Sequence, residues 1–112
     1  MLSRILAGFL RLDGVEQAML FSVEGHLIAS VGDEGKQPPA TQAQAFMLAA
    51  FEAAVSSNLG TWHEVWIEQD TRMMIDAVGE DRRIVLFGQG GRLARWRHAI
   101  DHNRGSLATT PL

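Results

Sequence analysis

One segment, residues 41–58, limits most strongly what this chain can fold into. Its apolar residues recur at helical spacing, with Thr41 as the predicted cap and Gly60 as the predicted terminating residue. One face of this helix carries large apolar side chains, namely Met47, Leu48, Phe51 and Val55, with Phe46 and Ala50 at its margin. The opposite face carries Ala45, Ala49 and Ala53 among Gln42, Glu52 and Ser56. A helix that is apolar or small nearly all round is usually buried on two sides, and alanines four residues apart let a second helix approach closely.

The chain has 112 residues, enough for one domain and too few for a second lobe. We therefore expect the second covering surface of this helix to come from another subunit. Domains of this size bury a smaller share of their surface than larger ones, so added area from a partner would also raise stability.

The remaining pattern predicts a five-stranded sheet between helices. Unbroken apolar runs in several strands indicate that both sheet faces are covered, although short turns favour antiparallel pairing. The predicted fold is an α/β (α+β) sandwich of order α-β-β-α-β-β-β-α, mainly antiparallel, with the long second helix on one face and the N- and C-terminal helices on the other. The single domain spans residues 1–103, and residues 104–112 form a flexible C-terminal tail. The other predicted elements are helices 2–10 and 92–103 and strands 15–22, 26–31, 62–69, 72–78 and 82–88.

Composition excludes several classes of function. The formal net charge of -3 disfavours nucleic acid as a partner. The absence of cysteine excludes disulfides, thiolate nucleophiles and cysteine-based zinc sites. No stretch approaches the ~20 apolar residues that cross a bilayer, so we expect a cytoplasmic protein with no membrane insertion.

Two motifs could carry metal or nucleotide chemistry. His98 and His102 lie four residues apart on the last helix, beside Asp101, a spacing that could place two imidazoles on one metal ion. No third ligand is visible, which favours solvent-facing residues and no metal site. The glycines of residues 88–91 follow a strand and open a helix, as a phosphate cradle would, but the third glycine of the dinucleotide motif is Leu93, which favours a simple turn and no cofactor.

No catalytic residues are predicted. His63 and Glu64 are neighbours on a strand and point to opposite faces, so they cannot converge on one substrate, even with Asp70 nearby. The Ser56-Ser57 pair lies outside any nucleophile elbow. Within the strand at 72–78, Asp76 is expected to form an ion pair with Arg72, Arg82 or Arg83 across the sheet.

Trp62, Glu64, Trp66 and Glu68 share one face of the strand at 62–69. Two tryptophans separated by carboxylates are typical of an interface. The alternative is that both indoles pack under a neighbouring helix.

The segment 14–30 resembles the opening hairpin of the Roadblock/LC7 family. The resemblance lies in the Gly14-Val15 start, the small Ala18 of the first strand, the acidic Glu24-Gly25 turn and the Ile28-Ala29 ending. It continues through the Ala-rich second helix and the three-strand meander, over residues 2–103. Glu24 stands where the family often has Asp, which is a mild departure.

The resemblance implies homodimers or heterodimers in which the second helices lie side by side and the third strands join two sheets into one. Family members of the MglB type typically regulate Ras-like small GTPases without a nucleotide site of their own, and other members act as scaffolds for dynein cargo attachment or lysosomal signalling. The resemblance thus implies that this chain is a homodimeric, non-enzymatic regulator of a Ras-like small GTPase. The implied dimer contacts are Phe46, Ala49, Ala50, Ala53, Trp62 and Trp66, and the implied partner-binding residues are Gln42, Glu52 and Ser56.

Two alternatives remain open. A scaffold subunit without a GTPase would share every feature above. A small-ligand sensor would need a pocket under the loop at residues 32–40.

Overall fold

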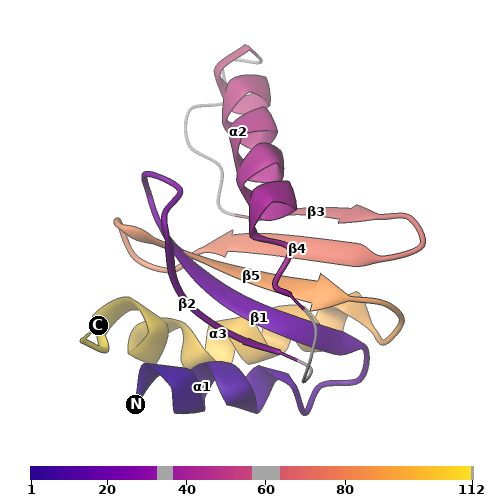
Figure 1. Ribbon diagram of the computed structural model, residues 1–112, viewed down its shortest axis with the longest axis vertical. Coiled ribbons are helices and arrows are strands. Elements are labelled where there is room, and N and C mark those ends of the chain that lie inside the picture. The colour runs from indigo at the N-terminus through magenta and orange to yellow at the C-terminus, as the bar shows by residue number, and fades with distance from the viewer. Residues whose placement is uncertain (33–36, 57–63, 112) are drawn as a thin grey trace.

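The computed structural model of the chain describes residues 1–32, 37–56 and 64–111. Figure 1 shows a sheet with helices on both of its faces. The order of elements is the predicted one. The elements are α1 (Leu2–Phe9), β1 (Val15–Ser22), β2 (Leu27–Gly32), α2 (Ala40–Ser56), β3 (Glu64–Glu68), β4 (Arg72–Ala77), β5 (Arg82–Gly88) and α3 (Leu93–Thr109).

The five strands form one sheet in the order β2-β1-β5-β4-β3, and each neighbouring pair is antiparallel. The central strands are β1, β5 and β4, which explains their nearly unbroken apolar runs. Ala18 illustrates the register, since it pairs with Val31 of β2 on one side and Leu86 of β5 on the other. The two edge strands are therefore β2 and β3.

Side chains alternate between two cores, one on each face of the sheet. Leu20 and Leu86 belong to a cluster that includes Leu6, Trp96 and Ile100, so α1 and α3 cover that face. Met19 and Val85 belong to the opposite cluster, which includes Ala43 of α2. This arrangement confirms the predicted sandwich.

The helix α3 continues to Thr109, so its predicted end at Asn103 is wrong. Residues 104–109, predicted as part of a tail, form its last turns, and Leu107 is fully buried. Arg82 Nη1 donates to the carbonyl oxygens of Leu107 and Thr110, at 2.8 and 2.7 Å, and so stabilises the helix end. A single buried leucine after Ile100 gives little periodic signal, which is why the pattern missed this extension.

Asp76 is buried on β4, and its partner is Arg104 of the same helix extension. Arg104 Nη2 donates to Asp76 Oδ2 at 2.7 Å and to Asp101 Oδ1 at 2.7 Å. The prediction that Asp76 pairs with an arginine of the sheet is therefore wrong. Burial raises the pKa of the Asp76 carboxyl, while the hydrogen bond and positive charge of Arg104 oppose that rise. The same two carboxylates raise the pKa of Arg104.

The helix α2 begins at Ala40, one residue before the predicted cap. Its first turn starts on the prolines, because Ala43 N donates to the Pro39 carbonyl oxygen at 3.0 Å. Thr41 is thus inside the helix. The predicted terminating residue, Gly60, lies outside the described residues.

Candidate interaction surface

The helix α2 rises away from the sheet, and its C-terminal end projects past β3 in Figure 1. Only Ala43 and Ala54 of this helix are buried. Its N-terminal half packs on the sheet through Ala43, Phe46 and Met47. Beyond Met47, the large apolar side chains of α2 are turned to solvent.

Those exposed side chains form a row along one side of α2. Leu48, Phe51 and Val55 are exposed to 58%, 60% and 60%. Their spacing of three and four residues places them on one helix face. We call these three residues the α2 stripe. A row of large apolar groups exposed in this way is typical of a surface that another protein covers.

The predicted residues of α2 separate into three groups. Ala49 and Ala53 are exposed on the side of α2 away from the α2 stripe, and Ala50 is half-buried. Phe46 packs against the sheet cluster, so at least part of its side chain belongs to the contact between helix and sheet. The predicted partner-binding residues are all exposed, namely Gln42, Glu52 and Ser56.

The edge strand β3 adds a second exposed element. Trp66 and Ile67 are 46% and 44% exposed. Glu64 and Glu68 bond to residues on the α3 side of the sheet, so Trp66 also lies on that side. Ile67 lies on the α2 side with Val65, which packs in the cluster beneath α2. The alternative that Trp66 is hidden under a helix is wrong, and Trp62 lies outside the described residues.

Ion pairs on the α3 side fix the position of β3. Arg97 donates through Nε and Nη2 to the Glu64 carboxylate, at 2.8 and 2.6 Å for the shortest contacts. These bonds raise the pKa of the Arg97 guanidinium. At the other end of the strand, Arg72 Nη2 donates to Glu68 Oε2 at 2.9 Å. The edge of the sheet is thus held at both ends.

The buried Arg72 also explains the glycines of residues 88–91. Its guanidinium lies 4.7 Å from the centre of the Trp96 ring and donates to the carbonyl oxygens of Gly90 and Gly91, at 3.1 and 3.3 Å. Both glycines have positive φ, 76° and 70°, which suits glycine. The turn therefore presents carbonyl oxygens to a cation, whereas a phosphate cradle presents N–H groups.

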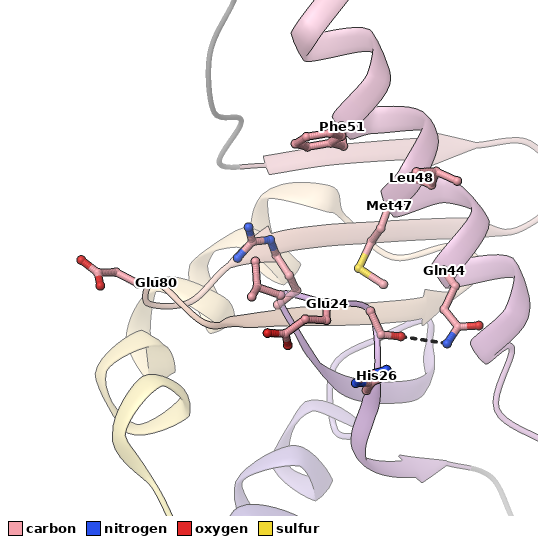
Figure 2. A pocket seen from close by; sticks show the side chains of 10 residues that line it. Glu24, His26, Gln44, Met47, Leu48, Phe51 and Glu80 are labelled. Carbon is pink, nitrogen blue, oxygen red and sulfur yellow. Dashed lines mark hydrogen bonds between the residues drawn. The ribbon is translucent and has the colours of Figure 1, made fainter.

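A hollow of about 740 Å³ lies beside the α2 stripe (Figure 2). Gln44 Nε2 donates to the Gly25 carbonyl oxygen at 2.8 Å and joins α2 to the β1–β2 turn below it. The sequence missed this hollow because three separate segments form it. The predicted ligand pocket was under the loop at residues 32–40, and of its described residues, 32 and 37–40, none lines the hollow. The lining residues are Val23, Glu24, Gly25, His26, Gln44, Met47, Leu48, Phe51, Glu80 and Arg83.

Within the described ranges, no group of three or more His, Asp or Glu side chains is placed to hold a metal ion. His63 and Ser57, weighed as catalytic residues, lie outside those ranges. Glu64, weighed beside His63, is bonded to Arg97. A search of the described helices for one long and apolar enough to span a membrane finds none.

Comparisons with known proteins agree with this geometry. A family model described as the Roadblock/LC7 domain matches residues 1–87. The fold is similar to that of the gliding protein MglB from Thermus thermophilus, with a TM-score of 0.82, 21% identity, and coverage of 96% of this chain and 85% of that one. It is also similar to MglB from Myxococcus xanthus, with a TM-score of 0.77, 15% identity, and coverage of 95% and 90%.

A Roadblock/LC7 domain from Streptomyces avermitilis gives a TM-score of 0.76 at 18% identity, covering 93% of this chain and 92% of that one. A search of curated protein sequences gives no match.

Proposed function

Because this chain belongs to the Roadblock/LC7 family, we propose that it is a dimeric, non-enzymatic regulator that binds a Ras-like small GTPase and modulates its nucleotide cycle. The family consists of regulatory and adaptor domains, and the structural neighbours include MglB proteins. The observation that carries the proposal is the α2 stripe, a row of large apolar side chains that a single chain leaves exposed.

Dimerisation is the first part of the proposal. Ala49 and Ala53 are exposed on the side of α2 that faces away from the α2 stripe, and their small side chains allow a second helix to pack closely. The edge strand β3 pairs only with β4 among the described strands, so backbone groups along its other side remain available. A second copy could satisfy both features at once, with α2 beside its equivalent and β3 beside its equivalent.

Ala49→Arg tests the dimer, because a charged side chain would enter a close contact between helices. We expect sedimentation velocity at micromolar concentration to show monomers. Ala94→Arg is the matched control, since Ala94 is an exposed alanine on α3, on the opposite face of the sheet. If Ala49→Arg stays dimeric, the assignment of this helix face to the dimer is wrong.

The second part of the proposal is that the GTPase binds on the α2 side. Exposed polar groups at Gln42, Glu52 and Ser56 lie to one side of the α2 stripe, and the hollow beside the stripe offers a concave contact. Interfaces that combine an apolar centre with a polar rim are typical of specific protein partners.

The test begins with affinity capture from native lysate, with a non-hydrolysable GTP analogue in one arm and GDP in the other. A Ras-like GTPase enriched with the GTP analogue would then be purified, and its binding and GTP hydrolysis measured with and without this protein. We expect Glu52→Lys to weaken binding and Arg95→Glu, a charge reversal on exposed α3, to leave it unchanged. If the same proteins are captured with either nucleotide and none of them is a GTPase, the proposal is overturned and a scaffold role is favoured.

A further inference from the structure

Two histidines lie side by side on the solvent face of α3. His98 and His102 are both exposed, and their ring centres are 6.3 Å apart with the ring planes 22° from parallel. Residues four apart on a helix lie one above the other on the same face. The two imidazoles are therefore already neighbours.

The helix turn that carries them is held firmly to the rest of the domain. Trp96 and Ile100 are fully buried within the same two turns. Arg97 bonds to Glu64 on β3, and Arg104 bonds to Asp76 on β4. The two histidines are thus presented on an anchored segment and lie well inside the helix, which runs to Thr109.

We propose that His98 and His102 form a two-imidazole chelating site for a late first-row divalent metal ion, with Cu²⁺ bound most tightly. Imidazole nitrogen suits Cu²⁺, Ni²⁺ and Zn²⁺, whereas Mg²⁺ and Ca²⁺ prefer oxygen ligands. Because both rings are exposed, rotation about their side-chain bonds can bring one nitrogen of each ring to the ion. Water fills the remaining coordination positions.

The ligand set explains the expected selectivity. Asp101 lies between the histidines in sequence, but its Oδ1 accepts a hydrogen bond from Arg104 at 2.7 Å. Two imidazoles alone impose no particular coordination geometry. Affinity should then follow the general order for divalent metals, in which Cu²⁺ exceeds both Ni²⁺ and Zn²⁺.

Calorimetric titration with CuCl2, NiCl2 and MgCl2 in a non-coordinating buffer tests the site. We expect Cu²⁺ to bind more tightly than Ni²⁺, and Mg²⁺ not to bind. His98→Ala and His102→Ala should each weaken Cu²⁺ binding by about tenfold or more, because the second imidazole binds the same ion as an intramolecular ligand. Cu²⁺ should also raise the melting temperature of the unmodified protein, since the spacing exists only in the folded helix.

A spacing control separates chelation from histidine content. His102→Ala combined with Gly105→His keeps four histidines but places the pair seven residues apart, about 10 Å along the helix axis. Gly105 is exposed, and an added Cβ there meets no atom within 4 Å, so this variant should fold. Unchanged Cu²⁺ affinity in the spacing control, or loss of binding on replacing His26 and His63 instead, would overturn the proposal. Because α3 and α2 lie on opposite faces, neither result bears on the proposed GTPase function.

Discussion

The two faces of the sheet are covered to very different extents. On one face, α1 and α3 contribute Leu2, Leu6, Phe9, Trp96, Ile100 and Leu107 to the buried core. On the other face, α2 contributes only Ala43 to the buried cluster. The α1 and α3 face is also joined to the strands by ion pairs, including Arg97 to Glu64 and Arg104 to Asp76.

The α1 and α3 face is thus well covered within one chain, whereas on the α2 face large apolar side chains stay exposed. Both helices α2 and α3 have 17 residues, so length does not explain it. The helix α3 places its largest side chain, Trp96, in the core, whereas α2 leaves Phe51 exposed. Because a small domain buries a smaller share of its surface than a large one, a partner that covers such a surface adds proportionally more to its stability.

The largest expected effect on stability is at the sheet face that α1 and α3 cover. Trp96→Ala should lower the free energy of unfolding by about 3–5 kcal/mol, because it leaves a cavity and removes the ring beneath Arg72. It also removes the hydrogen bond from Trp96 Nε1 to the Asp13 carbonyl oxygen. Urea denaturation followed by circular dichroism measures the change. A loss below about 1 kcal/mol would mean that this face is not the stable core of the domain.

A smaller effect is expected from the ion pair that α3 makes with β4. Arg104→Ala should lower the free energy of unfolding by about 2 kcal/mol at neutral pH, because the buried Asp76 carboxylate loses its charged donor. The pair is partly exposed through Arg104, so the loss should be smaller than for a fully buried pair. Urea midpoints of the variant and the unmodified protein give the difference.

The same variant predicts a pH dependence with a defined sign. Burial raises the pKa of Asp76 in the folded protein, so the stability contributed by its protonated form is fully present below the unfolded pKa and is lost as pH rises through the folded pKa. The protonated carboxyl of Asp76 is neutral, so its burial does not depend on the positive charge of Arg104. The loss of unfolding free energy caused by Arg104→Ala should therefore become smaller as pH falls through the raised pKa of Asp76. Replacing the carboxyl in Asp76→Asn should remove most of this pH dependence. A deficit that grows on acidification would contradict this account.

The smallest effect on the folding of one chain is expected on the α2 stripe. Phe51→Ser should change the free energy of unfolding of the monomer by less than about 0.5 kcal/mol, since Phe51 is 60% exposed. At concentrations that favour the proposed dimer, the same change should lower the free energy of unfolding, because it weakens the contact through which a second copy would stabilise the fold. Urea denaturation at low and high protein concentration separates the two effects. A large loss of unfolding free energy at both concentrations would show that Phe51 stabilises the single chain and not a contact with a second copy.

The strands were the most predictable part of the fold. The range of β1 and of β5 follows from their apolar runs and flanking turns, since a central strand is apolar on both faces. The α3 extension was not predictable, because Leu107 is one apolar residue among polar ones. Its burial depends on α3 reaching the strands, and the bond from Arg104 to Asp76 joins residues 28 positions apart.

The candidate surface was predictable only in outline. The residues of α2 showed that the helix is apolar or small nearly all round, which predicts two covering surfaces. Helical spacing alone did not say which apolar side chains meet the sheet. The structure turns Phe46 and Met47 toward the sheet and leaves Leu48, Phe51 and Val55 exposed.

The sequence by itself determined the order of elements, the antiparallel sandwich and the apolar character of α2, because spacing, turn residues and apolar patterns act locally along the chain. Only the tertiary structure decided which arginine neutralises Asp76, which face of the edge strand carries Trp66, and where the hollow beside α2 lies. These features join segments that are distant in sequence. Their positions depend on how helices and strands pack, and that packing is a property of the whole domain.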